Sequence, residues 1–186
     1  MSNVLLKNVR LSFNSIFEAT DFEGDQNFAY NAKIMIEKGS EAEKVIKKAL
    51  LEAADGAFSG KGADVIKKVQ GDAAQFCLQP HKDDDSLLVL ATKRKEKAGR
   101  PIVVDVDKSP LTKDDGKPYP GCYVNVLCRP WAMASKGKHW IRCGLEGVQF
   151  VKDGEAFGQR TTPDAFPDLG AGDDDARGGQ RVLGGN

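Results

Sequence analysis

Tryptophan and arginine recur two positions apart at two places in the sequence, and this spacing suggests a shared chemistry. Arg129 is followed by Trp131, and Trp140 is followed by Arg142. Side chains of a β-strand alternate between its two faces, so within a strand each pair would lie on one face. An exposed indole ring can stack on a nucleobase, and a guanidinium can pair with a phosphate. The spacing favours contact with single-stranded nucleic acid; a core role for both tryptophans, with the cations as solvated surface, is the alternative.

The two pairs belong to a predicted β-hairpin. Residues 121–133 and 138–151 are both strand-like, and a four-residue segment, Ala-Ser-Lys-Gly, joins them. The face opposite Trp131 is small and apolar, which suits a buried core; it consists of Cys122, Val124, Val126 and Cys128. The faces that carry the tryptophans, together with the turn, add further candidates for contact with nucleic acid, namely Tyr123, Lys136 and Lys138.

A second group of cations begins where an apolar strand, predicted over residues 87–92, runs into a loop. The sequence there is Lys93-Arg94-Lys95-Glu96-Lys97, and Arg100 follows shortly after. Residues 93–152 hold thirteen Lys and Arg against six Asp and Glu, a local charge of +7, although the whole chain is neutral. Residues 163–186 hold two basic residues against five aspartates. A basic segment beside an acidic tail is typical of nucleic-acid-binding proteins.

Hydrophobic periodicity predicts the elements that must position these residues. Strands are expected over residues 4–13, 28–36 and 102–106, an amphipathic helix that Ser40 and Glu43 cap over 41–54, a short helix within 56–71, and a loop over 107–121. With the hairpin they make a mainly β fold with one or two helices. The architecture that fits is a five-stranded Greek-key barrel of the oligonucleotide-binding (OB) type. We expect one domain over residues 1–162 and a disordered acidic tail over 163–186.

Catalytic and metal sites find little support in the sequence. The four cysteines form no Cys-x-x-Cys pair, and the two histidines lie at no zinc-finger spacing. Phosphate-binding loops, nucleophile elbows and zinc-protease motifs are absent from it. Carboxylates could hold Mg²⁺ in a nuclease, but aspartates are common in turns, and no candidate base or nucleophile stands near these: Asp83, Asp84, Asp105 and Asp107. We therefore expect no catalytic residues, no metal and no cofactor.

Three segments carry a resemblance to a known family. They are Asn-Val-Arg-Leu-Ser-Phe-x-x-Ile-Phe-Glu (8–18), Tyr-Pro-Gly-Cys-Tyr-Val-Asn-Val (119–126) and Gly-Leu-Glu-Gly-Val-Gln-Phe-Val-Lys-Asp-Gly-Glu-Ala-Phe-Gly (144–158). Together with residues 30–38 they resemble the phage-encoded single-stranded DNA-binding proteins formerly grouped as an uncharacterised family, DUF2815. The resemblance implies an OB barrel that coats single-stranded DNA without catalysis, with Arg10, Tyr123 and the hairpin aromatics on the DNA side. Related replication proteins often end in an acidic tail with a terminal aromatic residue, whereas this chain ends Leu-Gly-Gly-Asn.

These observations predict a sequence-tolerant single-stranded DNA-binding protein that acts in phage DNA replication or recombination, in the cytoplasm of the infected bacterial host. RNA binding or strand annealing on the same barrel is the alternative, and a Mg²⁺-dependent nuclease is a weaker one. Expected partners besides DNA are phage or host replication proteins, through the tail, and further copies of the chain; no membrane is expected. The candidate contact residues are Arg10, Tyr30, Lys33, Lys93, Arg94, Arg100, Tyr123, Arg129, Trp131, Lys136, Lys138, Trp140 and Arg142.

Overall fold

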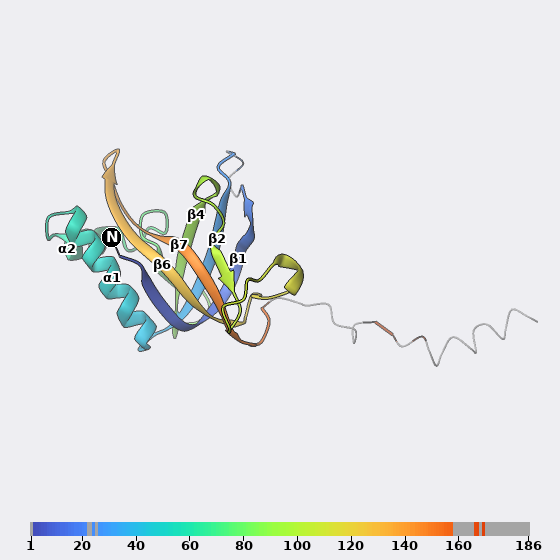
Figure 1. Ribbon diagram of the computed structural model, residues 1–186. Helices are drawn as coiled ribbons and strands as arrows, with labels where there is room; N and C mark the ends of the chain where they lie inside the picture. The colour runs from blue at the N-terminus through green and yellow to red at the C-terminus, as the bar shows by residue number, and fades with distance from the viewer. Residues whose placement is uncertain (1, 22–23, 25, 158–165, 168, 170–186) are drawn as a thin grey trace, which may run out of the picture. The chain divides into compact units, whose positions relative to one another are not determined.

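Seven strands, two α-helices and two short 3₁₀ turns make up the part of the chain that the computed structural model describes, which is residues 2–21, 24, 26–157, 166–167 and 169 (Figure 1). The strands are β1 (Val4–Thr20), β2 (Ala29–Glu37), β3 (Leu78–Pro80), β4 (Leu87–Lys95), β5 (Ile102–Val104), β6 (Tyr123–Ser135) and β7 (Lys138–Lys152). The helices are α1 (Glu41–Ala57) and α2 (Gly62–Val69), and the turns are η1 (Glu96–Ala98) and η2 (Lys113–Asp115). Met1–Ala156 forms one compact unit, and the predicted tail lies almost wholly outside the described residues.

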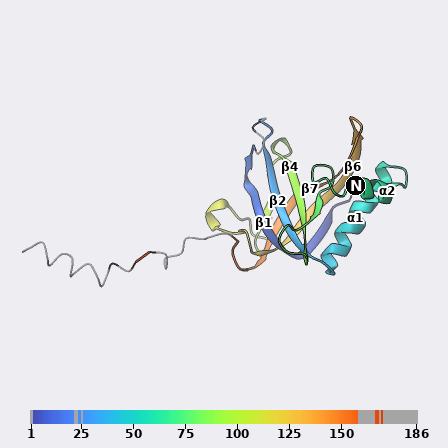
Figure 2. The ribbon, with the colours of Figure 1, turned by 180° about the vertical axis from the view of Figure 1, so that it is seen from behind.

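Five of the strands close into a barrel. Around it the order is β1, β2, β4, β7 and β6, and β6 pairs with β1 again (Figures 1 and 2). Every pairing in this ring is antiparallel except that of β4 with β7, which is parallel. This connectivity is that of the OB-type Greek-key barrel, so the predicted fold class is confirmed.

The core follows the alternation of apolar side chains along the strands. Leu6, Ile34, Leu90, Val124 and Leu145, one from each barrel strand, are completely buried. Alternate residues of the same strands therefore face outward, and the outer face is where polar and aromatic side chains are free to contact a ligand.

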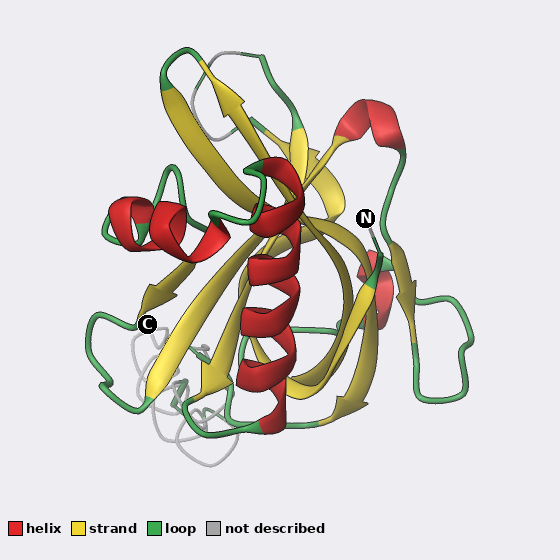
Figure 3. Ribbon diagram, turned by 90° about the vertical axis from the view of Figure 1, so that its left-hand side faces the viewer, coloured by secondary structure: helices red, strands yellow, loops and turns green. Residues whose placement is uncertain are grey.

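Helix α1 lies across the barrel strands and covers one side of them (Figure 3). Its buried residues recur at helical spacing and are Ala42, Ile46, Ala49, Leu50 and Ala54. Ser40 begins the helix, and its side chain accepts a hydrogen bond from the Glu43 backbone nitrogen. Half of the predicted capping box is thus present, because the Glu43 carboxylate accepts a hydrogen bond from the Gly39 nitrogen and not from that of Ser40. The helix runs three residues beyond the predicted end. No helix among the described residues is long and apolar enough to cross a membrane.

The strands depart from the predictions where the pairing is irregular. β1 continues to Thr20, seven residues beyond the predicted end. The sequence did not predict this second half because register shifts between Leu11 and Asn14, and between Ser15 and Thr20, interrupt the two-residue alternation that marks a strand. β5 ends at Val104 because a turn follows, with Lys108 in the left-handed region. β3 was not predicted, since three residues are too few to show a period.

Candidate nucleic-acid interface

The outer face of the β6–β7 hairpin carries the aromatic and basic side chains that the sequence placed there. Trp131 is paired with Arg142, and Met133 with Trp140, so the two tryptophans are diagonal neighbours on one face. Both indoles are half-buried, and Met133 between them is 46% exposed. On the opposite face, Val126 and Cys128 are completely buried. The predicted division of this strand into two faces is therefore confirmed.

The turn over residues 72–77 holds the hairpin in place. The Ile141 nitrogen donates to the Gln75 carbonyl oxygen at 2.8 Å, and the Cys77 nitrogen donates to the Ile141 carbonyl oxygen at 3.1 Å. One guanidinium nitrogen of Arg142 also donates to the Ala73 carbonyl oxygen at 2.8 Å. On the inner side, the His139 ring meets the Phe58 ring edge-on at 5.0 Å. The segment between α1 and β4 therefore stiffens the hairpin, a role that its weak periodicity does not reveal.

One cross-strand row links this hairpin to the basic end of β4. Lys93 pairs with Gly144 of β7, and Gly144 pairs with Arg129 of β6. Lys93 and Arg129 are both exposed. A Cβ atom on Gly144 would lie 3.4 Å from the Arg129 carbonyl oxygen, so the glycine leaves the surface between the two cations flat. Glu146 lies beside this row: its carboxylate is 3.8 Å from the Arg129 guanidinium, which also donates to the Asn3 side-chain oxygen at 3.0 Å, so a phosphate that binds Arg129 would compete with Glu146.

Further predicted cations lie around this row. Lys33 is exposed on the outer face of β2, opposite Ala91. Lys136 and Lys138 are exposed at the tip of the hairpin, and Lys136 adopts a left-handed turn conformation. Arg100 is exposed in the loop before β5. All four can attract phosphates, and two of them lie on barrel strands, Lys33 on β2 and Lys138 at the start of β7.

Tyr30 and Arg94 of the predicted set are engaged within the barrel's own structure. Tyr30 is only 9% exposed and alternates in phase with the buried Ala32, so it points inward and cannot stack on a base at the outer face. Arg94 pairs with Tyr30 across the strands. Its guanidinium donates to the carbonyl oxygens of Gly99 and Ala98 and forms a 3.1 Å ion pair with Glu146. These bonds anchor η1 to the barrel, and Glu146 also lies 3.8 Å from Arg129.

Arg10 and Tyr123 form a separate cluster. The Arg10 guanidinium lies 5.8 Å from the Tyr123 ring centroid, and the Lys152 ammonium lies 4.8 Å from it. Arg10 also donates to the carbonyl oxygens of Gly121 and Glu155. Tyr123 is six residues from Arg129 along β6, a separation of about 20 Å at the rise of a strand. The structure thus does not bring Arg10 and Tyr123 together with the hairpin tryptophans.

The segments that carry the family resemblance meet at this second cluster. The Tyr119 hydroxyl donates to the Asp153 carboxylate at 2.6 Å, and burial raises the pKa of Tyr119. A Cβ atom on Gly154 would lie 2.2 Å from the Gly121 carbonyl oxygen, so only glycine fits there. These residues fasten the chain after β7 to the start of β6, which gives them a structural role.

The aspartates of the nuclease alternative serve as turn residues. Asp84 accepts hydrogen bonds from the backbone and hydroxyl of Ser86, and these bonds lower the pKa of its carboxyl group. Lys117 lies 2.9 Å from Asp105 and lowers the pKa of that carboxyl group. Within the described ranges, no three His, Cys, Asp or Glu side chains gather as a metal site would require. The geometry gives the nuclease reading no support.

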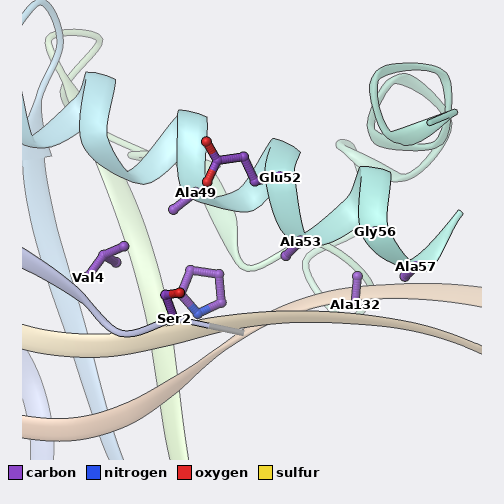
Figure 4. Close-up of a pocket in the computed structure, with 9 residues that line it drawn as sticks. Ser2, Val4, Ala49, Glu52, Ala53, Gly56, Ala57 and Ala132 are labelled. Atoms are coloured by element: carbon purple, nitrogen blue, oxygen red, sulfur yellow. The ribbon is translucent and has the colours of Figure 1, made fainter. Parts of the chain in front are cut away.

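A pocket of about 490 Å³ lies between α1 and the inner side of the hairpin (Figure 4). Small side chains of α1, including Ala49 and Ala53, line it opposite Ala132. Glu52 is its charged lining residue, and a carboxylate would repel a phosphate. The pocket therefore does not extend the basic face.

The sequence and the fold both place this chain among known proteins. Residues 2–176 match the family described as the ssDNA-binding protein of Enterobacter phage Enc34. The chain belongs to this family. A relative of this chain is a protein called p50 from Acyrthosiphon pisum secondary endosymbiont phage 1. The two are 34% identical over 178 residues, and the alignment covers 89% of this chain and 93% of that protein.

Two solved structures share the family's barrel. The single-stranded DNA-binding protein from bacteriophage Enc34, in complex with ssDNA, superposes with a TM-score of 0.68 at 19% identity, covering 84% of this chain and 89% of the other. The single-stranded DNA-binding protein gp2.5 of bacteriophage T7 gives a TM-score of 0.56 at 13% identity, covering 91% and 97%. At these identities the two likenesses establish a common fold. The match to the Enc34 family confirms the resemblance to phage single-stranded DNA-binding proteins.

Proposed function

We propose that this protein binds single-stranded DNA on the outer face of the barrel and coats it during phage DNA replication or recombination. The observation that carries the proposal is the row from Lys93 across Gly144 to Arg129, which continues onto the tryptophan face of the hairpin. Membership of a family named for ssDNA binding supports it. The protein would act in the cytoplasm of the infected bacterial host, where phage DNA is copied.

The binding mechanism combines stacking with phosphate neutralisation. Trp131 and Trp140 offer the flat faces of their rings to successive bases, and each stacked base contributes about 1 to 3 kcal/mol. Lys93 and Arg129 neutralise phosphates and release counterions from the strand. Neither interaction reads the edge of a base, so binding is sequence-tolerant. No step of bond making or breaking is needed, and we propose that the protein is not an enzyme.

The experiment that tests this function is one titration series. Fluorescently labelled single-stranded DNA, single-stranded RNA and duplex DNA of equal length are each titrated with the full chain, with and without Mg²⁺. We expect tight binding of single-stranded DNA, weak binding of duplex, and intact oligonucleotides throughout. Tighter binding of RNA would favour the RNA-binding alternative, and Mg²⁺-dependent cleavage would favour the nuclease. Binding that prefers the duplex would contradict the proposal.

A further inference from the structure

Two exposed phenylalanines lie on β1 and directly before β2. These strands follow β4 on the side of the Lys93–Arg129 row that is away from the hairpin. Phe13 of β1 is 69% exposed, and Phe28, directly before β2, is 46% exposed. A single exposed apolar side chain is ordinary on a protein surface. These two differ because Phe13 opposes a lysine in the strand pairing and Phe28 shares a groove with three lysines, Lys93 among them.

A bulge turns Phe13 outward. Leu11 pairs with Ile34 and Asn14 pairs with Ala32, so two residues of β1, Ser12 and Phe13, oppose the single residue Lys33. A β-bulge of this kind redirects a side chain that regular pairing would place elsewhere. Phe13 therefore lies opposite Lys33 in the pairing of β1 with β2, and both side chains are exposed. Trp131 and Arg142 are likewise an aromatic and a basic residue opposite each other in the strand pairing.

Phe28 lines a groove of about 410 Å³ with cations along it. Lys93, Lys95 and Lys97 line the groove together with Phe28, and Glu96 is its one acidic lining residue. The Glu96 nitrogen donates to the Phe28 carbonyl oxygen at 3.1 Å, which fixes the backbone of Phe28 against η1. Ala29 pairs with Lys95, so the ammonium group and the ring start from adjacent positions. Lys93 belongs both to this groove and to the row with Arg129.

We propose that Phe28 and Phe13 are two further base-stacking positions, so that the bound strand continues from the hairpin tryptophans over the Lys93–Arg129 row to β2 and β1. The inference rests on the proposed function, because it extends the same binding face. Phe28 stacks on a base within the groove while Lys95 and Lys97 pair with the neighbouring phosphates. Phe13 stacks on a base farther along the bound DNA, and Lys33 lies opposite Phe13 in the strand pairing.

The test compares Phe28→Ala, Phe13→Ala and the double variant with the full-length wild-type protein. Affinity is measured by fluorescence anisotropy on oligothymidylates of roughly 4 to 16 nucleotides, the range of site sizes of OB folds. The occluded length is measured by stoichiometric titration of poly(dT). Val106→Ala, which truncates another exposed apolar side chain in the turn after β5, is the matched control, and Phe28→Tyr retains an aromatic ring.

We expect each single Phe→Ala variant to bind long oligothymidylates roughly 5- to 150-fold more weakly, the effect of losing one stacked base. The double variant should also occlude fewer nucleotides, while Val106→Ala and Phe28→Tyr bind as the wild type does. Equal affinity and occluded length in the wild type and the double variant, with Trp140→Ala weakened, would overturn this inference and leave the proposed function standing. If the wild type binds no oligothymidylate, both proposals fail. If Phe28→Tyr binds as weakly as Phe28→Ala, the stacking role of Phe28 is also overturned.

Discussion

Lys93 of β4 and Arg129 of β6 lie on either side of Gly144 in one cross-strand row of the outer face. The two strands that carry them are not neighbours; β7 separates them and presents a residue without a side chain. The two cations therefore flank Gly144, and the Glu146 carboxylate lies beside them, 3.8 Å from Arg129. This arrangement depends on the parallel contact that closes the barrel, because Lys93 meets Gly144 only there.

The row predicts how binding depends on salt. The slope of log K against log salt is negative, and Lys93→Gln and Arg129→Gln should each reduce its magnitude by about 0.7, since each removes one phosphate contact to a single strand. The double variant should lose about twice as much. Lys48→Gln on α1 is the control, because Lys48 is exposed on a helix away from the row. The measurement is a set of anisotropy titrations between low and physiological salt, and unchanged slopes would contradict a phosphate contact at these residues.

The hairpin tryptophans should contribute to binding without supporting the fold. Trp131→Ala and Trp140→Ala are each expected to weaken binding of single-stranded DNA by about 1 to 3 kcal/mol. Because both rings are half-buried on the outer face, the melting temperature should change little. Trp140→Phe keeps a stacking surface and should retain most of the affinity. A large fall in melting temperature, with affinity lost only in proportion to the unfolded fraction, would assign the tryptophan to the core.

Gly154 should be required for stability. In Gly154→Ala the new methyl group would start 2.2 Å from the Gly121 carbonyl oxygen, so the backbone must shift. We expect a loss of about 1 to 3 kcal/mol in the free energy of unfolding, the cost of overpacking. Gly56→Ala is the control, since no heavy atom outside the helix's own backbone lies within 4 Å of its added Cβ atom. Denaturant unfolding measures both; equal stability of the two variants would show that the contact at Gly154 is looser than described.

The four thiols should be unreactive in the folded protein. Burial raises the pKa of Cys77 to about 12, a hydrogen bond with Cys128 and burial raise the pKa of Cys143, and burial raises that of Cys122. The nucleophilic thiolate is therefore scarce at pH 8, and the side chains are closed to reagents. Ellman's reagent should react slowly with the native protein and with four thiols after unfolding in guanidinium chloride. Fast reaction of any thiol in the native state would contradict its burial.

Removal of residues 163–186 should strengthen DNA binding at low salt. Truncation after Thr162 removes five aspartates and two arginines, so the formal net charge rises from 0 to +3. A tethered acidic segment competes with incoming phosphates at high effective concentration, and salt screens that competition. Affinity of the truncated and full-length chains is compared at two ionic strengths, and we expect the values to converge at the higher one. Weaker binding by the truncated chain would mean that Arg177 and Arg181 contact DNA.

Local periodicity in the sequence was enough to predict the barrel class, α1 and the two faces of the hairpin. Val124 and Val126 alternate with Tyr123 and Asn125, and this alternation indicates which face of the strand is buried. Ser40 and Glu43 likewise mark the start of α1, because a helix cap involves residues only three apart. Structure that depends on interactions between residues so close in the sequence can be predicted from the sequence alone.

Only the tertiary structure decided which members of a basic or aromatic cluster reach the outer face. Lys93 and Arg94 are adjacent, yet Lys93 is exposed in the row, whereas the Arg94 guanidinium is held by Glu146 and by the backbone of η1. Glu146 also lies 3.8 Å from Arg129 of the row. Phe13 gave no signal in the sequence, since the bulge that exposes it depends on the pairing of β1 with β2. The row from Lys93 to Arg129 likewise exists only through the register of three strands. Register is set when segments that are distant in the sequence pack together. The sequence of each strand therefore shows which of its residues share a face, but it does not show which residues of different strands meet on the binding face.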